Sequence, residues 1–434
     1  MAAGGQFNVA EAEVLMLEIV DPNVKKHFEE SAKAIKLIPQ GSAKFVNSRG
    51  VRLVGQVEPN PGMAWYGEGE QYATANTSKK IAMRVFFTRF SIARMLTGDA
   101  LDTTSRESLL DALSSGLQED TSTAMKQFNR DFYGDGTGTL GIVSAVTTGA
   151  NGTATFNATG SNSSPWGCRK ILNRGSYQFI NPSTGAVRVG GNAGGICNSV
   201  SKVTSTGVVT FDIVSSDVAA GDLIVLANSY NRSIHGLAYH VNNDTGAYQG
   251  ADRSVYEALR ATVIDAAVSS TNQPLSVSIL DKAEYESLYR TGSDYSVDDF
   301  MILSSPTQHA AYKALGYNLV RFQGGNGKTN YDAGLRVESH NGHPWVLDVD
   351  APNDKIYMLR KESFGKFEAK PFGILREGGQ VLRPVMTFDT SAVGGYFDRF
   401  IYYIGGKMDI GCTEPFKQVL IKNLDVTNLP QGIF

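Results

Sequence analysis

The chain has 434 residues, of which 42% are hydrophobic and 19% are charged, and its formal net charge is −3. A chain of this length is expected to form roughly three domains, and its core can be large enough to need no disulfide or metal. The near-neutral charge excludes the strongly basic surface of proteins that wrap nucleic acid tightly.

Cysteine usage and the N-terminal sequence set further limits. Cys168, Cys197 and Cys412 lie far apart, and their odd number indicates neither a disulfide framework nor a zinc site. No positive region precedes an apolar run at the N-terminus, so we expect no signal peptide. No run of about 18 apolar residues predicts a membrane span. A reducing, intracellular folding environment fits these features best.

Two short helices are predicted near the N-terminus, at Val9–Ile19 and Pro22–Leu37. Asp21 is a suitable N-cap, and Pro22 stands at the first helical position. The apolar stripe of the second helix is thin. We therefore expect this N-terminal arm to dock on the body of the chain or on another subunit.

A long projecting hairpin is predicted next. Its strands are Lys44–Val57 and Ile81–Met95, and the connecting segment Glu58–Lys80 is rich in glycine, proline and acidic residues. A hairpin of two strands is marginally stable alone, and aromatic side chains at its tip suit an interface between chains. The alternative is a loop folded back on its own domain. The candidate assembly residues are Pro61, Met63, Trp65, Tyr66 and Tyr72.

A helix of about 29 residues is predicted within Thr103–Gly136, far longer than the mean of about 11. Thr104 and Glu107 form a capping box, and the glycines at 134 and 136 end the helix. Its apolar residues form one narrow stripe, so the helix should lie across a sheet, with Glu119 and Asp120 facing solvent or a neighbouring subunit. The alternative is a long helix in a multidomain enzyme. The stripe consists of Leu109, Leu110, Leu113, Leu117, Ala124, Phe128 and Phe132, with Thr121 in its middle turn.

A β-rich segment follows a glycine-rich hinge at Gly134–Gly141. Ile142–Tyr230 contains many short β runs separated by turn residues, which predicts a small barrel or sandwich. The segment Gly236–Gly250 is expected to return the chain to the main body.

The chain from residue 251 has an α/β pattern. Arg253–Val268 is predicted as an amphipathic helix and Leu275–Leu280 as a buried strand. Asp281 and Glu284 form a capping box for a helix that ends at Leu288. Further strands are predicted at Phe300–Leu303, Leu335–Ser339, Trp345–Val349 and Lys355–Leu359, with a helix from Ser305–Pro306 and a turn at Asn341–Gly342. Beyond Phe388 two long strands are expected to pair and to cover the long helix.

Motifs for catalysis or cofactor binding are not found. GGNGKT at Gly324–Thr329 resembles a phosphate loop, but Phe322 replaces the required glycine. Asp131 and Asp135 resemble part of a calcium loop without its closing glutamate, so a helix end is the better interpretation. No GxSxG, HExxH or GxGxxG occurs. We expect no enzyme activity, no catalytic residue, no cofactor and no metal.

Two histidine pairs are candidate metal ligands. His340 and His343 flank the Asn–Gly turn, while His235 and His240 lie in the segment that returns from the β-rich part. Neither pair has an apparent third ligand in the sequence. Structural or surface roles are therefore the favoured interpretation.

The order of these parts resembles that of the major capsid proteins of tailed bacteriophages, which have the Hong Kong 97-type α+β fold. FTRFSIARMLTGDAL before the long helix, FNRDFYGDGTGTLG at its end and the run Asn341–Phe364 are similar to segments of that family. The resemblance implies an extended E-loop hairpin, a peripheral (P) domain with a long spine helix, and an axial (A) domain. An inserted β-barrel or sandwich is absent from the simplest members. The implied division is an N-terminal arm at 1–40, the E-loop at 41–96, the spine at 97–141, the insert at 142–250, the A domain at 251–384 and C-terminal P-domain strands at 385–434.

The resemblance implies a structural role. The protein would assemble with itself into pentamers and hexamers of an icosahedral shell around double-stranded DNA, which it contacts weakly and non-specifically. Portal, scaffolding and cement or decoration proteins would be its other partners, and it would form the virion capsid after assembly in the bacterial cytoplasm. The acidic, lysine and asparagine trio of the family's isopeptide cross-link is not matched. The alternatives are an encapsulin-type compartment shell protein and a glycan-binding β module attached to an α/β enzyme.

Overall fold

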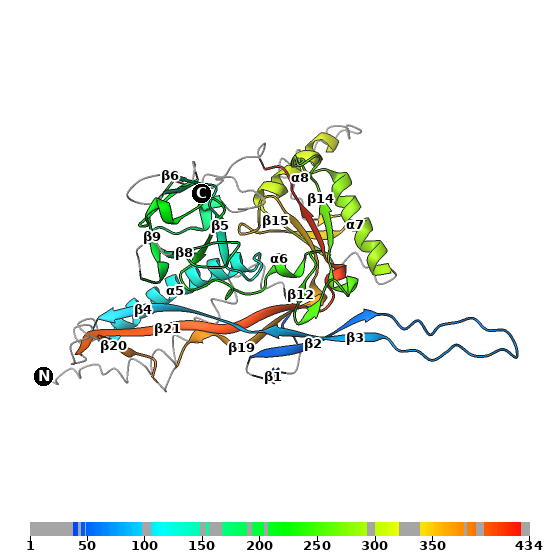
Figure 1. Cartoon of the computed structure of the whole chain (residues 1–434), viewed down its shortest axis with the longest axis horizontal. Coiled ribbons are helices and arrows are strands. Elements are labelled where there is room, and N and C mark those ends of the chain that lie inside the picture. The colour runs from blue at the N-terminus through cyan, green and yellow to red at the C-terminus, as the bar shows by residue number, and fades with distance from the viewer. Residues whose placement is uncertain are drawn as a thin grey trace, which may run out of the picture.

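The computed structural model describes residues 38–426, apart from 42–44, 48, 98–105, 148–152, 156–166, 189–192, 204–206, 293–299, 321–338, 377–379 and 388–394. The predicted helices at Val9–Ile19 and Pro22–Leu37 lie outside this part of the chain, as does the Gly324–Thr329 loop. A long, narrow layer of strands runs beneath a body of two lobes, and a hairpin projects from one end of that layer (Figure 1).

The long layer is organised by β21 (Gly395–Cys412), an antiparallel partner of three other strands. β4 (Thr88–Thr97) pairs along one edge, and β19 (Phe364–Ile374) and β20 (Arg383–Thr387) share the other. The strands approach closely in the middle, where a Cβ at Gly405 would collide with the carbonyl oxygen of Phe90. A glycine is therefore required at this position.

The predicted pairing of the two C-terminal strands is wrong. β22 (Val419–Lys422) joins a different sheet from β21 and pairs with β14 (Thr262–Asp265) and β18 (Ile356–Arg360). A short 3-10 turn at Pro415–Lys417 separates β21 from β22 and redirects the chain. Proline cannot continue a ladder of backbone hydrogen bonds, so the strand ends before this turn.

The long helix is confirmed as α5 (Arg106–Asp131). Its buried stripe packs on the β21 layer in one hydrophobic core with Tyr402 and Ile404, and the Phe128 ring lies 5.4 Å from that of Phe90. The described stripe residues are all buried, namely Leu117, Thr121, Ala124, Phe128 and Phe132. Thr104 and the side chains of Leu109, Leu110 and Leu113 lie outside the described part.

One polar residue of α5 differs from expectation. Asp120 faces β4 rather than solvent, because Arg94 of β4 pairs with its carboxylate at 3.2 Å. The same guanidinium donates a hydrogen bond of 2.6 Å to the Gly116 carbonyl. Glu119 is exposed, as predicted.

The hairpin is formed by β2 (Gly50–Glu58) and β3 (Lys79–Phe86). β1 (Phe45–Asn47) pairs with the other edge of β2, in the same sheet. The predicted single strand Ile81–Met95 is divided at Phe87. The part before Phe87 pairs with β2, and the part after it is β4, which pairs with β21. Phe87 is buried between the two sheets, and its amide donates to the Arg49 carbonyl at 3.0 Å.

A seven-stranded sheet follows α5 and has a hydrophobic core of its own, which includes Tyr177, Phe179 and Phe211. The next segment belongs instead to the main core, where Ile234, Leu237 and Val241 pack with the α5 stripe. α6 (Leu237–His240) lies in that segment. The sheet order is β5 (Thr139–Ile142), β11 (Leu223–Leu226), β8 (Ser176–Ile180), β9 (Cys197–Val203), β10 (Val208–Phe211), β7 (Thr153–Thr155) and β6 (Ala145–Thr147).

The second lobe is a six-stranded mixed sheet with two helices, α7 (Val277–Thr291) and α8 (Pro306–Val320), that share a core with it. The predicted strands at 300–303 and 355–359 and the helix from Pro306 are confirmed. The strand order is β14, β22, β18, β15 (Phe300–Ser304), β17 (His343–Leu347) and β16 (Ser339–His340).

Two predictions in this lobe are wrong. Arg253–Val268 holds β14 and a 3-10 turn at Glu257–Leu259 instead of a helix. Leu275–Leu280 holds the start of α7 instead of a strand, with the Ser276 hydroxyl accepting from the Ile279 amide. Short apolar runs do not distinguish strands from helices, and here pairing with β22 decided the first case. Asp281 and Glu284 consequently lie inside α7.

A polar network joins α5 to both lobes. Asn129 donates to Asp348 at 3.0 Å and to Asp350 at 2.8 Å, and the Tyr133 hydroxyl donates to Asp348 at 2.8 Å. Lys170, next to the core of the seven-stranded sheet, pairs with Asp350. Burial and the neighbouring Asp348 raise the pKa of Tyr133, so its hydroxyl stays protonated as a donor.

Candidate assembly surface

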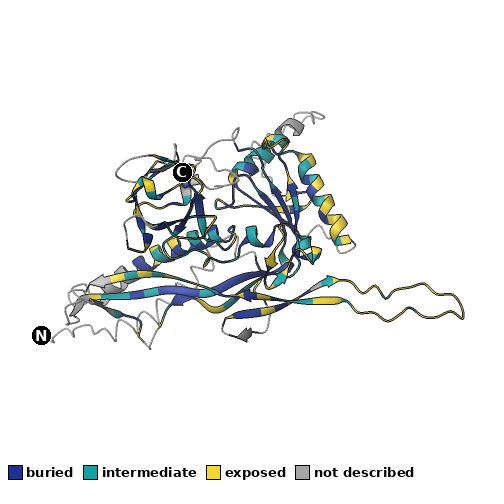
Figure 2. Ribbon diagram, in the orientation of Figure 1, coloured by how far each residue is buried: buried dark blue, intermediate teal, exposed yellow. Residues whose placement is uncertain are grey.

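The loop at residues 59–78 extends beyond the end of β2 and β3 and is exposed along most of its length (Figure 2). It carries all five predicted assembly residues, and Pro61 is exposed with the others. Trp65 is 92% exposed, Met63 77%, Tyr72 74% and Tyr66 58%. Large apolar side chains that are exposed together on one loop are typical of a surface that another molecule covers.

The tip of the loop is shaped by its own residues. Glu70 closes a turn, with its amide donating to the Gly67 carbonyl at 3.1 Å and its carboxylate accepting from the Gly67 amide at 2.9 Å. Gly69 adopts a φ of 84°, which a side chain would disfavour. The rings of Tyr66 and Tyr72 then meet edge to face at 4.9 Å. This arrangement holds the two strands of the loop together.

The base of the hairpin is anchored in the body. Val51, Leu53 and Met83 point inward and share a core with Tyr248 and Phe367. Alternate residues of a strand face opposite sides, so the other side of the hairpin faces outward. The hairpin therefore has a stem packed on the body and an exposed tip.

Other exposed apolar side chains were missed by the sequence analysis. On the outer side of the hairpin stem, Val54 and Phe86 are exposed, and on α7 so are Tyr285, Leu288 and Tyr289. The α7 residues follow helical spacing, which the sequence alone does not distinguish from a core-facing stripe.

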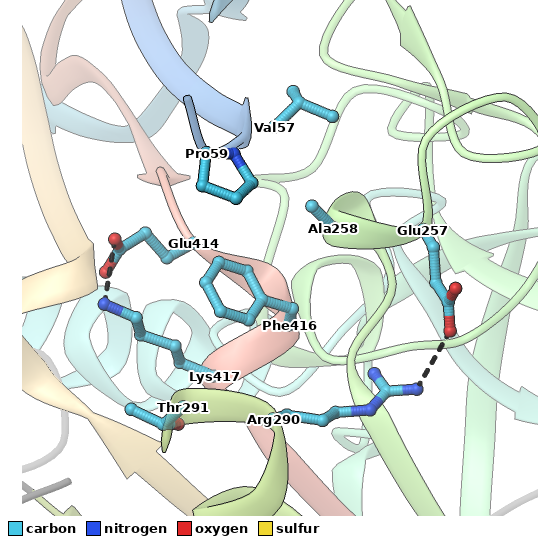
Figure 3. Close-up of a pocket in the computed structure, with 9 residues that line it drawn as sticks. All are labelled: Val57, Pro59, Glu257, Ala258, Arg290, Thr291, Glu414, Phe416 and Lys417. Atoms are coloured by element: carbon cyan, nitrogen blue, oxygen red, sulfur yellow. Dashed lines mark hydrogen bonds and ion pairs between the residues drawn. The ribbon is translucent and has the colours of Figure 1, made fainter. Parts of the chain in front are cut away.

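A recess of about 500 Å³ lies where the hairpin stem meets the body. Figure 3 shows Phe416 facing the recess beneath Pro59, with two ion pairs at its edges. Lys417 pairs with Glu414 at 2.9 Å, and Arg290 lies 3.6 Å from Glu257. An apolar centre with a charged rim is typical of protein–protein contacts, and these paired charges make no nucleophile–base set. The lining residues are Val57, Pro59, Glu257, Ala258, Arg290, Thr291, Glu414, Phe416 and Lys417.

The structure gives His235 and His240 two different roles. His240 is fully buried, with Nδ1 2.8 Å from the Tyr248 hydroxyl and Nε2 3.0 Å from the His235 carbonyl. Burial lowers the pKa of His240 to about 3, so it is neutral. His235 instead approaches Asp409, with 2.7 Å between Nδ1 and Oδ2. The two rings therefore do not converge on a shared metal position, and the structural interpretation holds.

His235 provides a pH-dependent contact between the returning segment and β21. Burial disfavours its charged form, but the hydrogen bond and charge of Asp409, with a smaller contribution from Asp135, outweigh burial and raise its pKa above 6.5. Asp409 is buried, and the backbone amide of His235 also donates to its Oδ1 at 2.9 Å. The charged pair thus joins two segments that are distant in sequence.

We expect the melting temperature to fall as pH rises from about 6 to about 8. A raised pKa contributes stability that is complete below the ordinary pKa and is lost as pH rises through the folded-state pKa. His235→Gln should flatten this slope, as measured by thermal melting at several pH values. His309→Gln on α8 is the matched control and should keep the slope. An unchanged slope in His235→Gln would contradict the prediction.

Asp131 and Asp135 have local partners. Asp131 accepts from Arg130 at 2.8 Å, and Asp135 accepts from the Thr137 amide at 3.0 Å. These local contacts lie at and just beyond the C-terminal end of α5 and agree with the interpretation as a helix end. Within the described ranges, no helix is both long and apolar enough to cross a membrane.

Comparisons with known proteins find similarity in structure only. No family model matches the chain, and no curated protein matches it. The chain of the cyanophage A-1(L) capsid asymmetric unit aligns with a TM-score of 0.52 at 12% identity, covering 91% of this chain and 93% of that one. A capsid chain of the native GTA particle covers 91% of each chain at 9% identity with a TM-score of 0.42. A chain of Mycobacterium phage Adephagia covers 92% of this chain and 91% of that one at 8% identity with a TM-score of 0.43.

The cyanophage alignment spans nearly the whole length of both chains. The protein therefore has a phage capsid-type fold of mixed helices and sheets. This confirms, at the level of the fold, the resemblance to the capsid proteins of tailed bacteriophages.

Proposed function

We propose that this protein is a major capsid protein of a tailed bacteriophage. Many copies assemble through pentamers and hexamers into an icosahedral shell around double-stranded DNA. The observation that carries the proposal is the exposed aromatic loop, at the end of an anchored hairpin, on a chain with a capsid-type fold. The function of the protein is the binding of its copies to one another, without a chemical reaction.

The family's domain names can be placed on this chain as part of the proposal. The hairpin of β2 and β3 is the E-loop, and α5 on the β21 layer is the spine of the P domain. The six-stranded sheet with α7 and α8 is the A domain. The seven-stranded sheet is the inserted β-rich domain. These roles are supported by the separate hydrophobic cores of the seven-stranded and six-stranded sheets.

We place the end of the insert earlier than Gly250. Ile234, Leu237 and Val241 pack in the main core, and Tyr248 packs under the hairpin. The Asn231 amide donates to the Thr137 carbonyl at 3.0 Å, so the chain leaves and re-enters the main body at neighbouring points. The proposed insert therefore comprises residues 138–230.

The loop tip is proposed to pack on a neighbouring subunit. Trp, Tyr and Met are enriched at the centres of protein interfaces, where a few aromatic anchors contribute most of the binding energy. The stem orders the tip before binding, which lowers the entropy lost on association. The recess below Pro59 and the exposed α7 residues are further surfaces available to neighbours.

The interior of the proposed shell needs only weak contact with DNA. A net charge of −3 provides no excess of cations for tight phosphate binding. Portal, scaffolding and cement proteins are proposed as further partners, with assembly in the bacterial cytoplasm and the virion capsid as the final location.

The test combines Trp65→Ala, Tyr66→Ala and Tyr72→Ala. These side chains are exposed, so the variant should keep the circular-dichroism spectrum and the melting temperature of the unassembled chain. It should fail to form shells, because truncating an interface anchor costs about 2 kcal/mol or more at each of many repeated contacts. Electron microscopy and size-exclusion chromatography measure the outcome.

Glu68→Ala is the matched control, since Glu68 is exposed on the same loop tip and should be tolerated. Normal shells in the triple variant would rule out the loop as an assembly surface. The contents of purified shells separate the capsid from an encapsulin-type compartment, because DNA is expected in the first and enzyme cargo in the second. A stable monomer with turnover on a sugar would support the glycan-binding alternative instead.

A further inference from the structure

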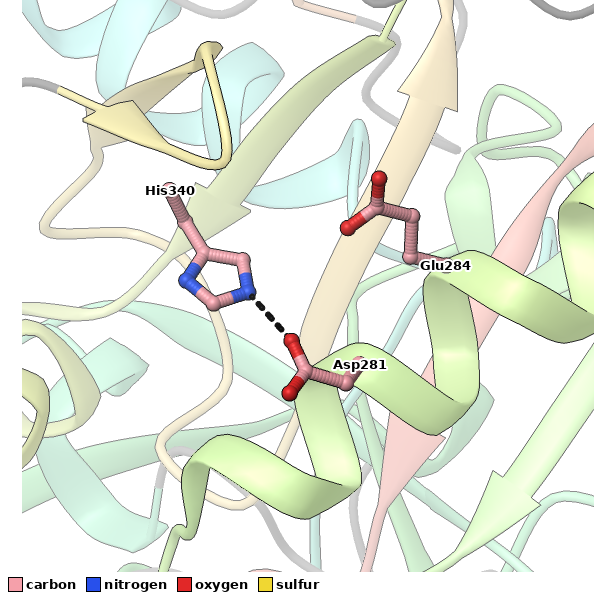
Figure 4. A group of neighbouring side chains, drawn as sticks. All are labelled: Asp281, Glu284 and His340. Carbon is pink, nitrogen blue, oxygen red and sulfur yellow. Dashed lines mark ion pairs between the residues drawn. The ribbon is translucent and has the colours of Figure 1, made fainter.

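His340 and His343 lie beside acidic residues that the sequence did not reveal as their partners. Asp281 and Glu284 are three residues apart on α7, so their side chains lie on the same face of the helix. Asn341 and Gly342 form the tight turn after β16, with φ values of 48° and 89°. This turn brings His340 against α7, and Figure 4 shows its ring directed at Asp281, with Glu284 on the next turn of the same helix.

The three side chains have the spacing of ligands around one cation. Their donor atoms all lie within 4.8 Å of one another. His340 Nε2 is 3.4 Å from Asp281 Oδ1. Tetrahedral zinc with bonds of about 2.0–2.1 Å places neighbouring donor atoms about 3.4 Å apart. The His340–Asp281 distance therefore fits one edge of a zinc tetrahedron. To bind the same ion, Glu284 Oε2 would exchange the hydrogen bond that it accepts from the Asn341 side-chain amide at 2.8 Å for the metal.

His340 is held in the orientation of a ligand. The residue is only 4% exposed, and its Nδ1 lies 2.8 Å from the Tyr312 hydroxyl. Tyr312 is itself fixed by stacking on Trp345, with ring centroids 4.5 Å apart. Metal-binding histidines commonly use their second nitrogen in such a contact, which sets the tautomer and the ring orientation.

The other ring nitrogen of His340, Nε2, faces Asp281. This atom is buried and makes no hydrogen bond, and its contact with Asp281 Oδ1, at 3.4 Å, is an ion-pair distance (Figure 4). The Tyr312 contact is compatible with either tautomer, and when Nδ1–H donates to Tyr312, Nε2 presents toward Asp281 the lone pair that a metal requires.

We propose that Asp281, Glu284 and His340 bind a divalent transition-metal ion, with zinc as the preferred metal. One imidazole and two carboxylates suit zinc, whereas calcium and magnesium prefer oxygen ligands alone. His343 Nε2 is 3.3 Å from Glu284 Oε1 and orients that carboxylate. Water would supply the fourth ligand. The bound ion would join α7 to the turn between β16 and β17, independently of the role proposed for the whole protein.

The test is titration of the metal-free full-length protein with Zn²⁺ by calorimetry, and with Co²⁺ as a spectroscopic probe. We expect one ion per chain, a tetrahedral Co²⁺ absorption spectrum and a higher melting temperature with zinc. Asp281→Asn and His340→Gln should each weaken binding more than about tenfold, and Tyr312→Phe about 10–100-fold through loss of ring positioning. Glu286→Gln on the exposed side of α7 is the matched control and should bind zinc normally.

Two results would overturn the proposal: no saturable binding of Zn²⁺, or binding that Asp281→Asn leaves unchanged. The second result would assign the ion to another part of the chain. His340 is buried, so circular dichroism must first show that His340→Gln is folded. Asp281 is partly exposed, so Asp281→Asn tests the proposal even when the histidine variant does not fold.

Discussion

Leu117→Ala combined with Phe128→Ala is expected to lower the free energy of unfolding by about 5–10 kcal/mol. Both side chains are buried between α5 and the β21 layer. They are separated by three helical turns, so their effects should add. Domains are stable by only about 5–15 kcal/mol, and the double variant should lose most soluble expression. Soluble yield and the loss of helical circular dichroism on heating measure the effect.

Glu119→Ala is the control on the same helix. The Glu119 side chain is 75% exposed and lies 3.9 Å from Arg94, a distance at which an exposed ion pair contributes little. Its replacement should change stability by no more than about 0.5 kcal/mol. Asp120 is not a suitable control, because its carboxylate pairs with Arg94 at 3.2 Å. Equal melting temperatures for Glu119→Ala and the single variant Leu117→Ala would contradict the assigned stripe.

Excision of residues 138–250 is expected to prevent folding, whereas excision of residues 138–230 should leave the rest folded. Each deletion is closed with a short Gly/Ser linker from Thr137. Both remove the seven-stranded sheet with its own core and the Lys170–Asp350 pair. Only the longer deletion removes residues of the main core. Loss of buried aliphatic side chains costs about 2–5 kcal/mol each, so removing several exceeds the stability of a domain.

The two deletions together measure the contribution of residues 231–250. That segment supplies Leu237 and Val241 to the core, and Tyr248 donates to the Cys412 carbonyl at 3.2 Å. Far-ultraviolet circular dichroism and cooperative thermal melting are the readouts. Similar folding of both variants would show that the returning segment is dispensable. Collapse of both would show that the seven-stranded sheet is required by the main body.

The elements that sequence analysis predicted well depend on local chemistry. α5 has a sustained apolar stripe and glycines at its end, and these features act within the helix itself. The exposed tip residues Trp65 and Tyr72 lie between turn-forming residues that keep them away from any core. Elements such as β15 and α8 were also predictable, because a buried run and a Ser–Pro helix start are strong local patterns.

The errors occurred where a distant segment decided the local structure. β14 was predicted as part of a helix, but its backbone pairs with β22, which lies far along the chain. The division at Phe87 depends on two sheets that each take one half of the predicted strand. The two C-terminal strands both exist, yet they belong to separate sheets. Strand identity and partners depend on long-range pairing that no local pattern contains.

By itself, the sequence determined the long helix with its buried stripe, the hairpin with its exposed aromatic tip, and the resemblance to phage capsid proteins that the fold confirms. Only the tertiary structure decided which histidines have acidic partners. His340 meets Asp281 because the turn after β16 folds against α7, whereas His240 is enclosed by Tyr248 and backbone carbonyls. Periodicity and capping act within a few helical turns, but the approach of groups distant in sequence depends on packing of the whole chain.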